Sequence, residues 1–272
     1  MRSLREQARL NVKDVWEVGG AYEFFMGRWS RLVAEEFLQW LSVPAGSTWL
    51  DAGCGTGVLS RAILEYAEPL KVRGIDQASG FISFATSHIH DPRATFEVGS
   101  AESFKVEPTS CDAVVSGLVL NFVPKAERVV SEMKRVTKPG GVVGAYVWDY
   151  AGRMEILRRF WNAAVALDSR AAVLDEGKRF PLCNPKTLKA LFISQELHDV
   201  HVGPIDVRTH FVDFQDYWTP FLAGQGPAPS YVASLSKHRQ SKLERRVLSD
   251  LPVSPDGAID LTARAWAVKG YV

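Results

Sequence analysis

The stretch from Thr48 to Gly57, which reads T-W-L-D-A-G-C-G-T-G, constrains this chain more than any other. Its apolar start leads to Asp51, and three glycines follow at Gly53, Gly55 and Gly57. Glycine is needed where the backbone takes a positive φ or touches a ligand. The spacing after Gly57 is typical of a helix, and a helix N-terminus directs unpaired N–H groups at whatever lies before it. The stretch therefore predicts a strand, a tight turn and a helix that hold a small molecule against bare backbone.

Predicted strands and helices alternate through the first half of the chain. Helical spacing occurs at 22–41, 81–88 and 126–136, and strand patterns occur at 72–77, 94–103 (strand, then loop), 111–122 and 141–148. This alternation predicts an α/β fold with a parallel sheet and helices on both faces. Such sheets bind ligands outside the carboxyl ends of their strands, where Asp76, Ser100 and Ser116 are expected to join Asp51.

The pattern changes after residue 150. Helices are expected within 150–182, from Asn184-Pro185 onward, and at 213–224 and 229–249. A loop is expected at 224–230. Strands are expected at 198–211 and at 259–272. The segments 151–182 and 212–256 are extra to a plain sheet, and we expect them to cap its binding edge. We therefore expect one domain over 1–272 with a cofactor-binding core at 22–150.

Composition excludes several other classes of protein. The chain is 46% hydrophobic and 23% charged, which is typical of a globular chain, and its net charge of +1 argues against a nucleic-acid binder. The odd number and wide spacing of Cys54, Cys111 and Cys183 indicate reduced thiols rather than disulfides or a zinc site. Residues 1–21 read as a loose polar arm without the apolar core of a signal peptide, and no run is long enough for a membrane span. A soluble, cytoplasmic protein is expected.

The residues around the glycine turn narrow the ligand. A dinucleotide site has the spacing G-x-G-x-x-G, whereas this turn has G-x-G-x-G. Asp51 would repel a pyrophosphate but suits an ammonium group. Asp76 follows Gly57 by 19 residues and is placed to accept hydrogen bonds from both ribose hydroxyls. These features indicate a nucleoside that lacks phosphates and carries a cationic amino-acid tail, and S-adenosylmethionine fits that description.

Five motifs in order resemble the class I S-adenosylmethionine-dependent methyltransferases. They are LDAGCGTG (50–57), GIDQ (74–77), GSAE (99–102), DAVVSGLVLNF (112–122) and RVTKPGG (135–141). The resemblance covers roughly residues 22–150 and is strongest to small-molecule enzymes of quinone biosynthesis or the trans-aconitate type. It implies a doubly wound, mostly parallel seven-stranded sheet of Rossmann-like type, here with helical cap insertions.

The resemblance also implies roles for particular residues. Asp51 is expected to order the turn and the cofactor's amino group, and Asp76 to hold the ribose with Gln77 beside the adenine. Ser116 and Gly117 are expected near the methionine amino end. The full set of implied cofactor contacts is Arg28, Arg31, Asp51, Gly53, Cys54, Gly55, Gly57, Asp76, Gln77, Ser100, Ala101, Glu102, Ser116 and Gly117.

Two parts of this set depart from the family or stay open. The third-strand loop often reads G-D-A in the family, but here it is Gly99-Ser100-Ala101, so a serine, or Glu102, takes the place of the adenine-binding aspartate. In the segment MGRWSR (26–31), Arg28 and Arg31 are candidates for a charge-assisted fork to the methionine carboxylate. Alternatively, both are solvated helix charges.

Methyl transfer from a sulfonium proceeds by direct displacement, so alignment of the two reactants is the main requirement. The sequence shows no metal-binding cluster and no G-x-S-x-G motif, and no metal is expected. A general base is needed only if the acceptor must lose a proton. Asp149 is the candidate at a strand end, and His201 and His210 are alternatives that are equally consistent with structural roles.

The acceptor is less constrained than the cofactor. Aromatic residues in or beside the capping segments form either an acceptor pocket wall, favouring an apolar or aromatic molecule, or the core of the cap: Trp148, Trp161, Trp218 and Phe221. Residues 121–124 (NFVP) lack the N-P-P-Y signature of base or glutamine methylation, and the basic run 236–246 reads as a solvated helix or an anion patch. A small-molecule methyltransferase is therefore expected; the alternatives are an RNA or protein methyltransferase, or a cofactor-binding protein without catalysis.

Overall fold

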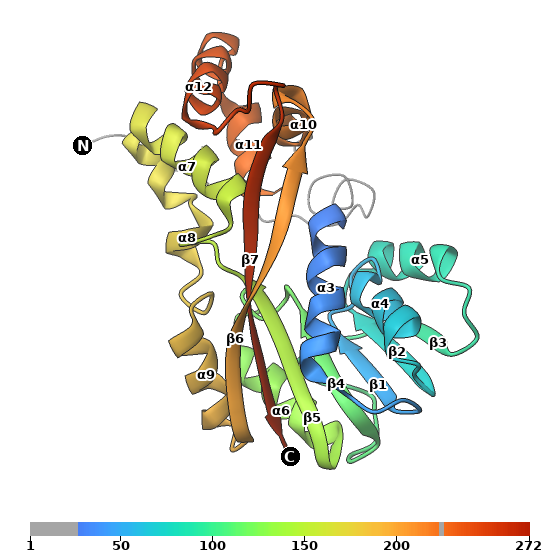
Figure 1. Cartoon of the computed structure of the whole chain (residues 1–272). Coiled ribbons are helices and arrows are strands. Elements are labelled where there is room, and N and C mark those ends of the chain that lie inside the picture. The colour runs from blue at the N-terminus through green and yellow to red at the C-terminus, as the bar shows by residue number, and fades with distance from the viewer. Residues whose placement is uncertain (1–26, 223–225) are drawn as a thin grey trace.

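The computed structural model describes residues 27–222 and 226–272 of the chain (Figure 1). The expectations for the arm at 1–21, for the start of the helix at 22–41 and for part of the loop at 224–230 lie outside the described residues. All elements below are named as in Figure 1.

A seven-stranded sheet forms the centre of the molecule, in the order β3-β2-β1-β4-β5-β7-β6. The first five strands are parallel, β7 is antiparallel to both of its neighbours, and β6 lies at the edge. The strands are β1 (Thr48–Ala52), β2 (Lys71–Asp76), β3 (Ala94–Val98), β4 (Cys111–Gly117), β5 (Thr137–Trp148), β6 (His198–Phe211) and β7 (Ile259–Tyr271). The predicted mostly parallel, seven-stranded fold is confirmed.

Helices cover both faces of this sheet, as the alternation of elements predicts. Helix α3 packs against α4 on one face, and α6 packs against α9 on the other (Figure 1). The apolar side chains of α6 recur at helical spacing and are fully buried, at about 1.5–3 kcal/mol for each large side chain. The core helices are α3 (Arg28–Leu41), α4 (Val58–Tyr66), α5 (Ser79–His88), α6 (Ala126–Val136) and α9 (Pro185–Ser194).

Strands β6 and β7 are longer than the sheet that they join. β7 pairs with β5 from Ala265 to Tyr271, whereas among the strands Ile259 to Arg264 pair only with β6, and Ala263 makes an isolated bridge to Met154. The two strands therefore continue past the carboxyl end of β5 as a two-stranded ribbon, which carries the cap (Figure 1). The cap consists of α7 (Glu155–Leu167), η3 (Ser169–Val173), α8 (Glu176–Arg179), α10 (Phe214–Trp218), η4 (Thr219–Leu222), α11 (Pro227–Ser234) and α12 (Lys237–Asp250).

The prediction of one continuous helix at 229–249 is wrong. The chain breaks at Leu235 and Ser236, both in extended conformation, and the Ser236 side chain accepts a hydrogen bond from the Arg239 N–H to begin α12. Helix α11 begins earlier than expected, at Pro227, because proline suits the first helical position. Among the described residues, none of the helices combines the length and the apolar character needed to cross a membrane.

The aromatic residues of the cap pack against one another. The rings of Phe160 and Phe221 stack with centroids 4.6 Å apart, and Trp161 meets Phe160 edge-on at 5.0 Å. Trp161, Trp218 and Phe221 are each at most 3% exposed, and Trp148 is buried in β5. Of the two roles considered for these side chains, the structure supports the core of the cap and not an open pocket wall.

Candidate functional site

The glycine turn between β1 and α4 is built as the sequence predicts. Gly53, Gly55 and Gly57 have φ values of 76°, 54° and 86°, which side chains with a Cβ rarely adopt. The N–H groups of Gly53 and Cys54 donate to the carbonyl of Ile75 at 2.7 and 3.0 Å, which ties the turn to β2. Cys54 itself is buried, so the turn presents backbone rather than a thiol.

Only one of the three glycines faces open space. A Cβ added at Gly53 would lie 2.7 Å from Val119, and one at Gly57 would lie 2.6 Å from Ile89. A Cβ at Gly55 would have no atom within 4 Å. The outer glycines thus allow close packing inside the protein, whereas Gly55 leaves room for a bound molecule.

Asp51 lies beneath this turn, and only one of its two carboxylate oxygens has a hydrogen-bond partner among the described residues. Its side chain is 1% exposed, and Oδ2 accepts a hydrogen bond from the Ser60 hydroxyl at 2.7 Å. Oδ1 is buried without a hydrogen-bond partner among the described residues. Burial, together with the nearby Asp76 carboxylate, raises the pKa of Asp51 to about 7. A positively charged or proton-donating group of a ligand would satisfy this oxygen.

Asp76 ends β2 and reaches back to the turn. Its Oδ2 accepts from the Gly55 N–H at 3.0 Å, and Oδ1 accepts from the Ala78 N–H at 2.8 Å. Burial raises its pKa as well. Each carboxylate oxygen keeps a further lone pair for a ligand hydroxyl. The neighbouring Gln77 is exposed.

The third-strand loop lies beside Asp76, because the Gly99 N–H donates to the Asp76 carbonyl at 2.9 Å. Ser100 is exposed, and its hydroxyl accepts from the Glu102 N–H at 3.1 Å, while Ala101 and Glu102 are half-buried. The loop is therefore next to the turn, as expected, but the serine hydroxyl already serves a local turn. Its role toward adenine stays a prediction.

At Ser116 and Gly117, which end β4, the side-chain positions face the protein interior. The Ser116 hydroxyl is fully buried and donates to the Ala52 carbonyl at 2.8 Å, which fastens β4 to β1. A Cβ at Gly117 would lie 2.6 Å from the Tyr146 hydroxyl. The predicted contact with the methionine amino end is therefore left to main-chain groups.

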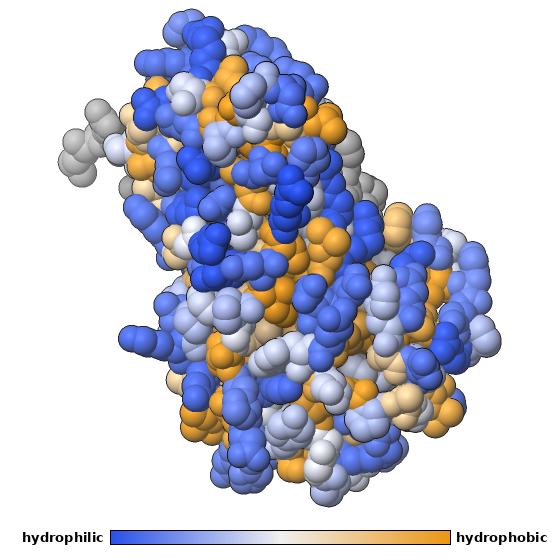
Figure 2. Space-filling view, in the orientation of Figure 1, coloured by the Kyte–Doolittle hydropathy of each residue, from blue (hydrophilic) through white to orange (hydrophobic). Residues whose placement is uncertain are grey.

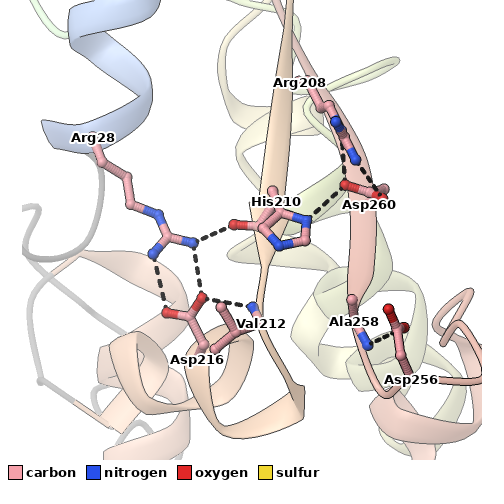
Figure 3. A network of polar contacts seen from close by, with 8 residues as sticks. All are labelled: Arg28, Arg208, His210, Val212, Asp216, Asp256, Ala258 and Asp260. Atoms are coloured by element: carbon pink, nitrogen blue, oxygen red, sulfur yellow. Dashed lines mark hydrogen bonds and ion pairs between the residues drawn. The ribbon is translucent and has the colours of Figure 1, made fainter.

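Arg28 pairs with a carboxylate of the protein itself (Figure 3). Its Nη1 and Nη2 lie 3.0 and 3.2 Å from the two Asp216 oxygens, and Nη2 donates to the His210 carbonyl at 2.8 Å. The bond joins the start of α3 to α10 of the cap. The Arg28 guanidinium is therefore taken up by an aspartate of the protein, and its predicted role toward the methionine carboxylate stays a prediction. Arg31 is exposed on the same helix.

None of the three candidate bases is presented to the turn. Asp149 is 7% exposed, and its two oxygens accept from the N–H groups of Gly152 and Arg153 at 3.0 and 2.9 Å, so it shapes the turn after β5. The His210 ring lies 3.0 Å from Asp260 on the exposed ribbon (Figure 3). His201 is wrong as a candidate, because it lies on the edge strand β6, four strands or about 19 Å from β1.

Asn121 is a candidate that the sequence reasoning did not single out. Both polar atoms of its amide are buried without a hydrogen-bond partner among the described residues. It follows β4 in the loop whose Val119 packs on Gly53, and the adjacent Phe122 meets Phe180, just after α8, at 5.1 Å. The available signal was an amide between two apolar residues directly after a buried strand. An amide left unsatisfied there is suited to a ligand's polar group.

Comparison with known proteins identifies the segment that carries this site. Residues 50–144 match the family model described as "Methyltransferase domain". A demethylmenaquinone methyltransferase from Bacillus licheniformis is 33% identical over 112 residues, which are 40% of this chain and 48% of that protein. The chain therefore spans about half the length of such curated relatives.

Two further proteins are similar over most of the chain. A trans-aconitate 2-methyltransferase from Variovorax paradoxus is 25% identical over 238 residues, which are 82% of this chain and 86% of that protein. The solved structure of phosphoethanolamine N-methyltransferase 2 from Haemonchus contortus, in complex with S-adenosyl-L-methionine, aligns at TM-score 0.57 with 18% identity, over 93% of this chain and 56% of that one. At this identity the structural likeness shows a shared fold.

Proposed function

We propose that this chain transfers a methyl group from S-adenosylmethionine to a small-molecule acceptor. The matched domain and the fold make it a class I methyltransferase. The observation that carries the proposal is the buried, unpartnered Asp51 oxygen beneath a glycine turn that is open at Gly55. A second carboxylate, Asp76, borders the same turn. Two acids at one turn favour a cationic ligand and disfavour a pyrophosphate.

The residues fit this cofactor. Asp51 would hold the amino group, the backbone from Gly53 to Gly57 would face the methionine and ribose, and Asp76 would accept from the ribose hydroxyls. S-adenosylmethionine supplies an activated methyl group on a sulfonium. The protein then has to bind and orient the two reactants and exclude water, and orientation alone is worth roughly 7–11 kcal/mol of a barrier.

The acceptor would lie between the carboxyl edge of the sheet and the cap. Asn121 is a buried polar side chain without a hydrogen-bond partner among the described residues, and the ring of the adjacent Phe122 packs against Phe180, which packs in turn against Tyr150. Relatives named for demethylmenaquinone and trans-aconitate support a small acceptor, and Phe122 and Phe180 would contact any apolar part of it. In this division, residues 22–150 bind the cofactor, and the segments 151–182 and 212–256 shape the acceptor side. The cytoplasmic location expected from the sequence stays a prediction.

A labelled-methyl screen tests the proposal. The full chain is incubated with S-adenosylmethionine labelled in its methyl group and with separate pools of metabolites, tRNA, rRNA and peptides. Label entering a metabolite pool is the expected result. Label entering only the macromolecules would replace the small-molecule assignment with the RNA or protein alternative. Cofactor binding without transfer to any pool would favour a binding protein.

A further inference from the structure

A hollow in the cap lies away from the glycine turn. It occupies about 400 Å³ between the end of α7, η3, α11 and the start of α12, at the end of the molecule far from β1 and α4 (Figure 1). This volume is within the range of small-molecule sites, which runs from about 300 to 1,000 Å³. Its lining includes Asp168, Arg170, Tyr231, Arg239, Lys242 and Leu243.

One wall of the hollow is apolar and contains an unpartnered hydroxyl. Leu243 is 1% exposed, and Tyr231 is 5% exposed with its ring against Phe160 and Trp161. The Tyr231 hydroxyl has no hydrogen-bond partner in the described part of the chain. A phenol hydroxyl that lines a cavity and has no partner within the protein offers a donor to a ligand.

The rim of the hollow carries surplus positive charge. Asp168 is the one carboxylate among the lining residues, and Arg170 holds it with two bonds of 2.9 and 2.7 Å. Arg239 reaches the same carboxylate only at 3.8 Å, and Lys242 has no ion-pair partner among the described residues. Figure 2 shows hydrophilic residues at the outer end of the cap, with apolar residues among them. The lining therefore keeps a net positive charge after its one acid is neutralised.

Spacing along α12 brings the two cations to one side. Lys242 lies three residues after Arg239 and four after His238, so it neighbours both on the helix surface, and all three line the hollow. Arg245 lies on α12 but does not line it, and Arg246 pairs with Asp250 at 2.8 Å. Only part of the basic run 236–246 is therefore directed at the cavity.

We propose that this hollow is a second binding site, separate from the glycine turn, for a small organic anion that joins a carboxylate or phosphate group to an apolar body. Arg239 and Lys242 hold the anionic group, the Tyr231 hydroxyl donates to it, and the apolar body lies against Leu243 and the other leucines of the lining, Leu167 and Leu235. The site does not depend on the proposed methyl transfer.

Titration calorimetry of the full chain tests the site with four probes: octanoate, phenyl phosphate, inorganic phosphate and 1-octanol. We expect octanoate or phenyl phosphate to bind about tenfold or more tightly than inorganic phosphate and 1-octanol, because only these probes match both halves of the site. The preferred probe distinguishes a carboxylate ligand from a phosphate ligand. Absence of binding by both organic anions would overturn the proposal.

Variants then locate the binding. R239A/K242A should weaken it about tenfold or more, and Y231F should weaken it about fivefold, because each removes donors to a charged group. R245A, on the same helix but outside the lining, should leave it unchanged, and thermal melts confirm folding of each variant. Equal affinity in R239A/K242A and the parent would contradict the assignment. Loss of octanoate or phenyl phosphate binding when S-adenosylmethionine is added would show that the site is not separate.

Discussion

Two buried carboxyl groups, one in the core and one in the cap, show how the two regions differ. Burial raises the pKa of both Asp51 and Glu176 to about 7. In the cap, Glu176 accepts a hydrogen bond from the Trp161 indole N–H. In the core, Asp51 keeps one oxygen without a partner. Both carboxyl groups therefore bear the cost of burial, but of the two only Asp51 keeps a buried oxygen without a partner, while Ser60 donates to its other oxygen.

Other buried groups follow this division only in part, because the Arg158 Nε on α7 of the cap is also buried without a hydrogen-bond partner. The cap's rings fill its interior, whereas the edge of the sheet is open at Gly55 and leaves the Asn121 amide unsatisfied. Unsatisfied buried polar groups are rare in folded proteins and cost about 1–3 kcal/mol each. The difference supports a division in which the glycine turn of the core holds the cofactor chemistry, whereas the aromatic interior of the cap is filled by its own side chains.

The largest effect is expected from filling the open space at Gly55, because this change tests whether the turn of the core binds the ligand. Gly55→Val should abolish measurable S-adenosylmethionine binding in calorimetry, because a branched side chain occupies the place of the ligand. Gly46→Val is the matched control, since Gly46 also has a positive φ and no atom within 4 Å of an added Cβ. Both variants carry a backbone strain of about 1–2 kcal/mol. Equal affinity in the two would remove Gly55 from the site.

Removing the carboxylate of Asp76 should have the next largest effect. Asp76→Ala is expected to weaken the binding of S-adenosylmethionine and of its demethylated product about 100-fold, because hydrogen bonds to charged groups contribute about 1.5–3 kcal/mol each. Asp112→Ala serves as control, because Asp112 also accepts a backbone N–H, from Thr48, but near the amino ends of the strands. A similar loss in both variants would indicate a general structural effect.

Asn121 tests the acceptor side of the comparison. Once an acceptor is known, Asn121→Ala should lower its kcat/KM about tenfold while cofactor affinity is kept, since one hydrogen-bonded contact is lost. Asn162→Ala, at an exposed position on α7, is the control and should change neither quantity. A fall in cofactor affinity alone would show that Asn121 contacts the cofactor and not the acceptor.

The raised pKa values of Asp51 and Glu176 should make the stability of the protein depend on pH. A free aspartate titrates near 3.9, so between about pH 4 and 7 the folded state binds more protons, and stability falls as pH rises through that window. Asp51→Asn and Glu176→Gln should each raise the free energy of unfolding at pH 8, at about 1.36 kcal/mol per unit of pKa shift removed. Melts at pH 5 and pH 8 measure this.

The pH dependence of cofactor affinity should distinguish Asp51 from Glu176. A ligand ammonium favours ionised Asp51, so affinity should rise up to about tenfold per pH unit from pH 5.5 to 7, with release of a proton. Calorimetry in buffers of different ionisation enthalpy detects that proton. The rise should vanish in Asp51→Asn and persist in Glu176→Gln; the opposite pattern would reverse our assignment of the two groups.

The smallest expected effect concerns the contact between the two regions. Arg28→Ala removes a partly exposed ion pair with Asp216, which is worth at most about 1 kcal/mol, and should lower Tm by about 2–4 °C. A double-mutant cycle with Asp216→Ala measures the coupling. Unchanged cofactor affinity is expected; a large loss would mean that the arginine leaves Asp216 to bind the cofactor carboxylate.

Local patterns in the sequence predicted much of this molecule. The glycine turn needed three positive φ values, which fix glycine at those positions, and the alternation at 198–211 predicted β6 to the residue. The pairing of Arg28 with Asp216 was not predictable, because 188 residues separate the two. The absence of partners around Asn121 likewise depends on distant packing. Local periodicity identifies elements, but it does not show which polar groups the fold leaves unsatisfied.

The ribbon of β6 and β7 has a consequence for how such a chain can be altered. Phe211 and Ile259 face each other in register where the chain leaves β6 and enters β7. The whole segment 212–258 is therefore, in topology, the loop of a hairpin. Because each doubling of loop length costs only about 0.6 kcal/mol, segments of other sizes can be grafted between these two residues without shifting the register of any strand. Half of the cap is thus exchangeable in topology, provided that the replacement covers the Phe160 and Trp161 rings against which Phe221 and Tyr231 pack.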